Sequence, residues 1–373
     1  MVTQGNTQQL QHYLRLASLP SIGIKRILQT SEHLRCSLDE LIDIKPKKLV
    51  DLGWNQSQLQ ALQGQNQPLE KRISQALSWL NSGSNRHILP IYSSLYPEQF
   101  YTMDSPPLVI FAEGNLELLT SKMLAIVGTR APTQYAYDVI NSLMPELSLY
   151  KGLSTVSGLA LGVDAICHRA SLANKIPTIG VLGCGIDIVY PKRHSQLYSD
   201  IKQQGLLISE FLPGSQPKAF HFPRRNRLIS GLASAVLITE GKIKSGSMVT
   251  VKCALEQNKE ILAVPCSMFN PNGELAHILI TEGAVPVRSA SDIMQNVPDF
   301  FDFNLLDKKI EKSCNQSLAT DPLLDSVGDS ATSVDLIAKR TGTPVVDVLT
   351  QLLEYELRGL VASTAEGYVK LRG

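Results

Sequence analysis

Three arginines surround one asparagine in the segment HFPRRNRLISGL, residues 221–232. The four residues are Arg224, Arg225, Asn226 and Arg227, and no acidic residue occurs in the segment or in the ten positions before it. Cations near the start of a helix are opposed by the helix dipole, so helix formation alone does not explain them. An external anion would explain them, and the four residues are therefore candidate contacts to a polyanion.

Aromatic rings accompany this charge. Phe222 lies in the same segment, and Lys218 lies three positions before the segment begins. Grooves for single-stranded nucleic acids combine cations that follow the phosphates with rings on which bases stack without sequence preference. The alternative is that an arginine pairs with Glu210 or Glu240 while Phe222 belongs to the core. Three arginines within four positions favour the anion-binding interpretation.

Other candidate contacts follow short apolar runs elsewhere in the chain. Small residues at such places let a ligand approach the backbone, and a helix that follows offers unpaired N–H groups to an anion. A plain helix cap is an equal alternative for the serine of SGS, and a surface salt bridge is the alternative for the arginine of GTR. These candidates are Gly128, Arg130, Ser157, Gly158, Lys192, Ser245 and Gly246.

The signatures of common catalytic and cofactor sites are missing. The loop VGTRAPT holds one glycine instead of G-x-G-x-x-G, GKIKSGS has the wrong order for a P-loop, and no G-x-S-x-G occurs. Asp164 and His168 lie four positions apart and could form an acid–base pair, but a local interaction on a helix is more typical of that spacing. No cluster has metal-ligand spacing. We therefore expect a binding protein without a cofactor or metal, and not an enzyme.

The elements that must position these residues alternate between strands and helices. Near-continuous apolar strands that alternate with helices imply a parallel sheet covered on both faces. The sequence thus predicts a doubly wound, Rossmann-like α/β domain over residues 86–297, with the ligand beyond the carboxyl ends of the strands. The apolar runs are MLAIVG, LSTVSG, TIGVLG, LLISE, AVLITE, ILAVP and a weaker AVPV.

The flanking segments have other patterns. Residues 1–85 carry apolar residues at helical spacing, which predicts a helical N-terminal domain. Residues 298–331 turn polar and Ser/Asp-rich, which is typical of a linker. Residues 332–373 follow the order helix, turn, helix and short hairpin, which is the outline of a winged helix.

The second helix of this winged helix is acidic. Asp347, Glu354 and Glu356 outnumber Arg358, and such a helix would repel a DNA backbone. We therefore interpret this domain as protein-binding or regulatory. The same charges disfavour a third hypothesis, a sequence-specific regulator of duplex DNA.

The composition limits the kind of partner and the cellular location of the protein. A net charge of +1 means that a polyanion must be held by a local patch. The six cysteines include no C-x-x-C pair, which suits reduced thiols better than a disulfide framework. The N-terminus lacks a signal-peptide pattern, and no apolar run approaches the roughly 18 residues of a membrane span. We expect a cytoplasmic protein without a membrane partner.

At this point a family resemblance emerges. Six ordered motifs resemble those of the DNA processing protein A family (DprA, also called Smf), whose outer domains are a sterile-alpha-motif-like helical domain and a winged helix. The chain departs from the family at Leu161, where arginine is usual, and at Cys266, where glycine is usual. The six motifs are AIVGTRAPT, SGLALGVDAICHRASL, GVLGCGIDIVYPKR, ISEFLPG, FPRRNRLISGL and SGSMVTVKCALEQNKEILAVP.

The resemblance implies a function. It implies a protein that binds single-stranded DNA during natural transformation, shields it from nucleases and helps load the RecA recombinase. It also implies a homodimer formed through the Rossmann-like domain and no catalytic activity. Family contacts carry over onto Arg130, Lys192 and the FPRRNR segment, with Lys218 as a nearby candidate. The alternative is a nucleotide-processing hydrolase of the lysine-decarboxylase-like (LOG) group, whose P-G-G-x-G-T-x-x-E motif has no match here.

Overall fold

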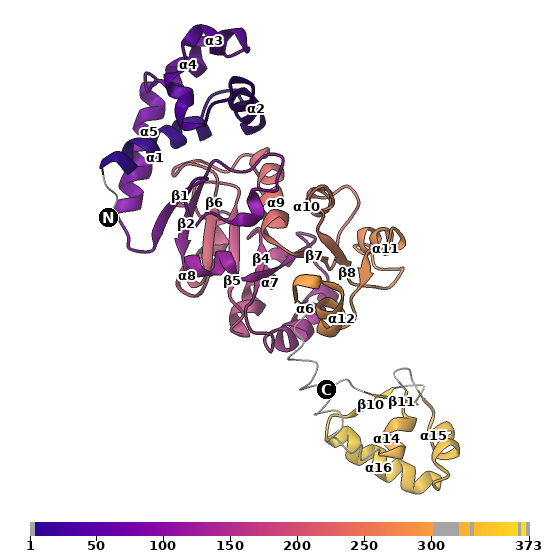
Figure 1. Cartoon of the computed structure of the whole chain (residues 1–373). Coiled ribbons are helices and arrows are strands. Elements are labelled where there is room, and N and C mark those ends of the chain that lie inside the picture. Colours follow the sequence, from indigo (N-terminus) through magenta and orange to yellow (C-terminus); the bar gives the residue numbers. More distant parts are fainter. Residues whose placement is uncertain (1–3, 301–320, 329–331, 365–366, 371–373) are drawn as a thin grey trace. The chain divides into compact units, whose positions relative to one another are not determined.

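A computed structural model describes residues 4–300, 321–328, 332–364 and 367–370 of this chain. The chain divides into two compact units, residues 1–301 and 302–373. The first unit holds the N-terminal helices and the sheet, and the second holds the winged helix (Figure 1).

The N-terminal part is helical, as the apolar spacing predicts. Its helices share a core that includes Leu14, Leu41 and Ile73. That core continues into the sheet, because the ring of Trp79 packs edge-on against Phe111 with 6.0 Å between centroids. The elements are α1 (Gln4–Ala17), α2 (Ile24–Leu34), η1 (Asp39–Asp43), α3 (Pro46–Asp51), α4 (Gln56–Leu62) and α5 (Gln67–Asn81).

A nine-stranded sheet forms the centre of the first unit, in the order β1-β2-β6-β5-β4-β3-β7-β8-β9. The strands from β6 to β9 run parallel, whereas β2 pairs antiparallel with β6 and β1 pairs antiparallel with β2. The strands are β1 (Arg86–Pro90), β2 (Val109–Gly114), β3 (Lys122–Val127), β4 (Leu153–Ser157), β5 (Thr178–Leu182), β6 (Leu206–Ser209), β7 (Ala235–Ile238), β8 (Glu260–Ala263) and β9 (Val285–Pro286).

The predicted doubly wound sheet is confirmed. All seven apolar runs named above form strands, and a further run, HILPIY at residues 87–92, contains most of β1. The antiparallel strand β2 was not predicted; it is a short apolar run that follows two prolines, and its pairing with β6 depends on a contact far away in the sequence. The chain order reverses between β3 and β7, where Ala125 pairs with Val156 on one side and Val236 on the other.

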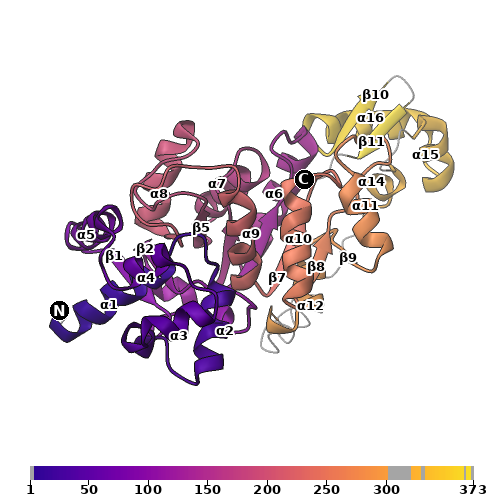
Figure 2. The ribbon, with the colours of Figure 1, turned by 90° about the horizontal axis from the view of Figure 1, so that it is seen from above.

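Helices cover both faces of the sheet, which explains why its central strands are apolar on both sides. The helices α6, α7 and α12 pack on one face, and α9, α10 and α11 pack on the other. The helices α9 and α10 run side by side (Figure 2). These helices, with α8 beside β2 and β6, are α6 (Gln134–Leu147), α7 (Val163–Ala173), α8 (Ser195–Gln204), α9 (His221–Leu232), α10 (Gly246–Glu256), α11 (Glu274–Thr281) and α12 (Ala290–Asn296).

The second unit is a small winged helix with its own core. Its elements are α14 (Pro322–Ser326), α15 (Val334–Thr341), α16 (Val345–Leu357), β10 (Val361–Thr364) and β11 (Gly367–Lys370). Helix α14 lies inside the predicted linker, yet Leu323 and Val327 are buried with Ile337 in the core of this unit. At the other end of that predicted linker, Phe300 is buried in the core of the sheet domain. The domains therefore extend further into 298–331 than the composition indicates.

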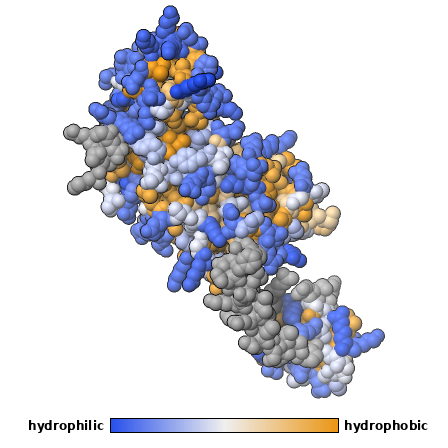
Figure 3. Space-filling model, viewed as in Figure 1, coloured by the Kyte–Doolittle hydropathy of each residue, from blue (hydrophilic) through white to orange (hydrophobic). Residues whose placement is uncertain are grey.

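The surface is mixed in polarity. On the face shown in Figure 3, hydrophilic side chains alternate with smaller apolar areas. Among the described residues, no helix combines the length and the apolar character that a membrane crossing requires.

Candidate nucleic-acid interface

A cavity of about 660 Å³ opens beyond the carboxyl edge of the parallel sheet, where the strand order reverses between β3 and β7. Doubly wound sheets bind their ligands at this reversal. Its walls come from the loop after β3 and from the first turns of α9 and α10. Seven of the candidates line it: Gly128, Arg130, Phe222, Arg225, Asn226, Ser245 and Gly246.

A cation and two rings meet at the mouth of this cavity. The guanidinium carbon of Arg130 lies 5.7 Å from the centre of the Phe222 ring, and the Tyr190 ring lies 5.5 Å from Phe222 on centroids. Arg130 is exposed and forms no ion pair with any described carboxylate. Tyr190 is 45% exposed and Phe222 is half-buried, so both rings are accessible from the cavity. A cation beside accessible rings is the arrangement that a single nucleic-acid strand requires.

Phe222 also has a structural role. A Cβ at Gly183 would lie 2.9 Å from the Phe222 ring, which means that the ring packs directly on the Gly183 backbone. The half-buried position of Phe222 is thus compatible with both the core and the stacking interpretations.

The first turn of α10 presents free polar groups to the cavity. Ser245 is the N-cap residue, but its hydroxyl forms no capping hydrogen bond, and its buried Oγ has no partner in the described part of the chain. The hydroxyl of Ser247 donates to the Gly128 carbonyl over 2.8 Å, which fixes the first turn against the end of β3. A Cβ at Gly246 would meet no atom within 4 Å. Ser245 thus occupies the N-cap position without capping α10 through its side chain, and contact between an anion and this helix end stays a prediction.

Arg225 forms the floor of the cavity and is only 3% exposed. Its guanidinium donates to the carbonyls of Gly158 and Val181, at the ends of β4 and β5, and its Nε donates to Asn226 over 3.0 Å. Burial lowers the pKa of Arg225, while the nearby carboxylate of Asp164 opposes that shift. The expectation that Arg225 needs an external anion is corrected: its partners are protein atoms, and its observed contacts position the two strand ends.

Gly158 is a glycine because of this arginine. A Cβ at this position would lie 2.5 Å from the guanidinium of Arg225. Ser157 before it is fully buried, and its hydroxyl donates to the Ile126 carbonyl over 2.8 Å. Neither Ser157 nor Gly158 lines the cavity. Both contact residues behind the cavity wall, whereas the sequence predicts direct contact with the ligand.

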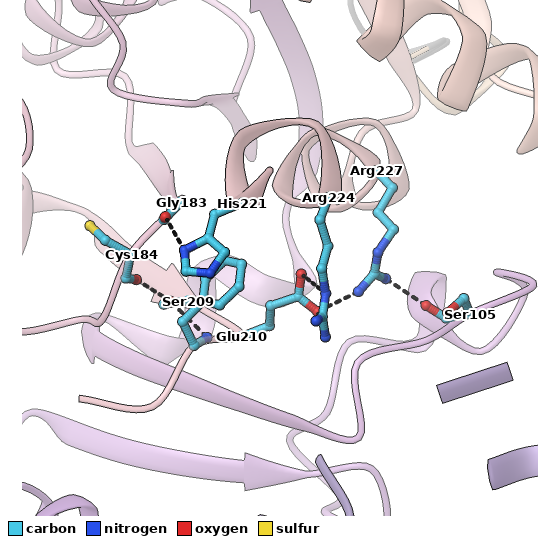
Figure 4. A network of polar contacts seen from close by, with 9 residues as sticks. Ser105, Gly183, Cys184, Ser209, Glu210, His221, Arg224 and Arg227 are labelled. Carbon is cyan, nitrogen blue, oxygen red and sulfur yellow. Dashed lines mark hydrogen bonds and ion pairs between the residues drawn. The ribbon is translucent and has the colours of Figure 1, made fainter. Parts of the chain in front are cut away.

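Arg224 and Arg227 share the carboxylate of Glu210, at the end of β6 (Figure 4). Arg224 Nε lies 3.1 Å from Glu210 Oε1, Arg227 pairs with the other oxygen, and Glu210 is 2% exposed at its side chain. The argument that these arginines lack an acidic partner is therefore wrong. The alternative pairing occurs, and it involves two arginines. Arg224 remains 45% exposed, whereas Arg227 is 15% exposed and also donates to the Ser105 carbonyl.

Asn226 links the two helices that border the cavity. Its side-chain amide donates to the Gly246 carbonyl over 3.1 Å, and its carbonyl oxygen accepts from Arg225. Asn226 thus acts on the shape of the site as well as lining it.

The suggested acid–base pair is not formed. Asp164 accepts hydrogen bonds from the backbone N–H groups of Gly158 and Ala160, at 3.2 and 3.3 Å. Burial raises the pKa of Asp164, and Arg225 works against that rise. His168 instead contacts Thr178 Oγ1 at 2.7 Å, and burial lowers the pKa of His168 to about 3. The described residues contain no group of three or more His, Cys, Asp or Glu side chains that could hold a metal ion.

Lys192 and Lys218 lie outside the cavity lining. Both are exposed and lack a carboxylate partner within the described ranges, and Lys218 lies 5.8 Å from the exposed Phe220 ring. Sequence reasoning gave no role to Lys242 and Lys244, which are exposed on the loop that leads from β7 into α10. Their signal is the pair of lysines in GKIKSGS, a segment in which the sequence predicts contacts only at Ser245 and Gly246.

Comparison with known proteins extends this description. The profile of the family described as DNA recombination-mediator protein A matches residues 87–298, and that of the DprA winged helix domain matches residues 312–367. The first match covers more than half of the chain. The chain belongs to the DNA recombination-mediator protein A family.

Relatives in this family support the assignment. Protein Smf of Escherichia coli is 40% identical over 309 residues, which cover 81% of this chain and 82% of the relative. The DNA processing protein DprA of Bacillus subtilis is 42% identical over 57% of this chain and 71% of its own. The resemblance to the DprA family in the six motifs is thereby confirmed.

Solved structures of the family share the fold. DNA processing protein A from Streptococcus pneumoniae has a TM-score of 0.63 and 30% identity, over 76% of this chain and 96% of its own. The protein from Helicobacter pylori, whose structure was described for its single-stranded DNA binding mode, has a TM-score of 0.50 and 28% identity, over 61% of this chain and 96% of its own.

Proposed function

We propose that this protein binds single-stranded DNA along the carboxyl edge of its parallel sheet. The observation that carries the proposal is the mouth of the cavity, where the unpaired cation of Arg130 lies beside the accessible rings of Phe222 and Tyr190. The single-stranded DNA binding described for the Helicobacter pylori relative supports the same assignment.

The two parts of a nucleotide would meet different walls. A phosphate fits the uncapped start of α10 and Arg130, because backbone N–H groups and a guanidinium both stabilise an anion. A base fits the rings of Tyr190 and Phe222, whose faces stack bases of any sequence. Duplex DNA keeps its bases stacked inside the helix, so this arrangement favours a single strand. The exposed cations Lys192, Lys218 and Arg224 would extend the path of the backbone.

The cellular role we propose follows from the family. A recombination mediator that holds a single strand shields it from nucleases and helps load the RecA recombinase during natural transformation, in the cytoplasm. We propose that it acts as a homodimer through the Rossmann-like domain and by binding, not by catalysis. The buried positions of Asp164 and His168 support binding without catalysis. Asp164 accepts hydrogen bonds from the backbone of Gly158 and Ala160, and one ring nitrogen of His168 contacts Thr178.

Fluorescence anisotropy with labelled oligonucleotides tests the DNA-binding proposal. We expect the full chain to bind a 30-nucleotide single strand at least about tenfold more tightly than a duplex of equal length at 0.1 M salt. Equal affinity for both would contradict the proposal. A nucleotide-turnover assay run beside it distinguishes the hydrolase alternative, which predicts hydrolysis of free nucleotide without a DNA preference. Stimulated assembly of RecA on strands coated with a single-strand binding protein tests the mediator role.

A further inference from the structure

Helix α16 of the winged-helix unit carries an apolar stripe on its solvent side. Its members are 42% to 83% exposed. Steps of three and four residues from Val346 onward keep them along one side of the helix. The five residues of this apolar stripe on α16 are Val345, Val346, Leu349, Leu353 and Leu357.

The fold of the unit does not use this stripe. The core face of α16 consists of Val348, Leu352 and Tyr355, which are at most 6% exposed and belong to the same core as Ile337 and Val361. A helix on the surface of a domain needs one apolar face for its core, and α16 has two. Contiguous exposed apolar side chains of this kind mark interaction sites.

Acidic residues border the stripe on its outer side. At 100° per residue, Asp347 and Glu354 follow Leu357 around the helix, on the side away from the core face. Asp347 is exposed and has no partner among the described residues, and Glu354 has only an exposed contact of 4.0 Å with Arg358. This border repels a DNA backbone. In an antiparallel pairing of two copies, the acidic border of one helix would face that of the other, so such a pairing is also disfavoured.

We propose that the apolar stripe of α16 docks an amphipathic helix of a partner protein whose basic edge faces Asp347 and Glu354. Binding of a helix in this way uses apolar anchors at helical spacing, which Leu349, Leu353 and Leu357 supply. The acidic border sets the orientation of the partner and selects its charge. This surface is separate from the residues proposed for DNA binding, and the proposal stands without them.

A peptide titration of the full chain tests this. The probe is a labelled 18-residue helical peptide with leucines at i, i+3, i+4 and i+7 spacing and lysines along one edge, and its matched control carries glutamates in place of the lysines. We expect the lysine peptide to bind at least about tenfold more tightly than the glutamate peptide at low salt. Leu353→Gln should weaken binding of the lysine peptide by about tenfold, because it removes a central apolar anchor.

Two further variants make the test specific. Gln351→Ala changes an exposed residue outside the stripe and should leave peptide binding unchanged, and the pair Asp347→Lys with Glu354→Lys should reverse the preference between the two peptides. All four substituted positions are exposed, and circular dichroism confirms folding of each variant. Equal binding of both peptides, or binding insensitive to Leu353→Gln, overturns the proposal. Self-association of the full chain in sedimentation that Leu353→Gln abolishes would assign the stripe to a second copy and also overturns it.

Discussion

Arg130 lies over the ring of Phe222, with 5.7 Å between its guanidinium carbon and the ring centre. The two residues come from different walls of the cavity, the loop after β3 and the first turn of α9. The ring holds the cation at the mouth of the cavity without neutralising it, because a cation–π contact leaves the positive charge available to a phosphate. The interface that we propose depends on this pair more than on the arginines of α9 that first drew attention.

Arg130→Ala should weaken single-strand binding by about tenfold at 0.1 M salt and lower the slope of log K against log salt by about 0.7, the value for one phosphate contact on a single strand. The measurement is an anisotropy titration at several salt concentrations. Lys122→Ala is the matched control, since Lys122 is exposed at the opposite end of β3 and should change neither quantity. An unchanged slope for the Arg130 variant would remove this residue from the interface.

Tyr190→Leu should weaken single-strand binding by roughly 1–3 kcal/mol while leaving the salt slope unchanged, because it removes a stacking surface and no charge. Leucine keeps an apolar contact with Phe222. Tyr137→Leu on α6, where a tyrosine is 40% exposed outside the cavity lining, controls for a general loss of aromatic surface. The stacking role fails if the two tyrosine variants bind alike.

Arg225→Ala should lower the free energy of unfolding by ~3–5 kcal/mol, because it leaves Asp164 as a buried charge without its cation. Since burial already raises the pKa of Asp164, loss of Arg225 should raise it further. A raised carboxyl pKa lowers the stability of the folded state as pH rises from the pKa of the unfolded chain toward that of the folded chain, so the variant should be destabilised less at pH 5 than at pH 7. Urea melts at both pH values measure this. A loss of DNA affinity with unchanged stability would instead make Arg225 a direct contact.

Arg227→Ala should lower the free energy of unfolding by about 1–3 kcal/mol, because it removes a half-buried partner of Glu210 and a hydrogen bond to the Ser105 carbonyl. Arg224→Ala should change stability by less than about 1 kcal/mol, since its side chain is 45% exposed. Its main effect is expected in DNA affinity. Chemical denaturation measures the stability of both variants, and anisotropy measures their affinity for DNA. A larger loss of stability for Arg224→Ala than for Arg227→Ala would contradict this prediction.

His168→Gln should flatten the loss of stability in acid. Burial lowers the pKa of His168 to about 3, so the unfolded chain binds this proton below about pH 6.5 and the folded chain does not. Protonation of His168 therefore leaves the free energy of unfolding unchanged above that pH. Between pH 6.5 and 3 it lowers the free energy of unfolding by about 1.4 kcal/mol for each unit by which the pH falls. His194 and His221, whose pKa values burial also lowers, keep part of the slope. His33→Gln, at an exposed position, serves as the control substitution.

The sequence predicts the parallel part of this fold well, because strands buried on both faces are apolar throughout and leave a clear pattern. It does not predict β2 or α14, since the first depends on antiparallel pairing with β6 and the second is a short helix in a polar stretch. The candidate site shows the same contrast between local sequence patterns and contacts that form only on packing. Charge and ring content predict Arg130 and Phe222, whereas Glu210 enters only as an alternative partner for one arginine. It is fourteen and more positions away and becomes a neighbour of both Arg224 and Arg227 only when α9 packs at the end of β6.

The hydrogen bonds of Arg225 to the ends of β4 and β5 have a consequence for the thermodynamics of binding. They fix the floor of the cavity before any ligand arrives, so the protein gives up little conformational entropy when a strand enters. The ordering falls on the DNA instead. Affinity should then vary with the base stacking within the free strand. A thymine tract stacks weakly, so it loses little stacking when its bases move onto the rings of Tyr190 and Phe222. It is therefore a suitable reference ligand for this site.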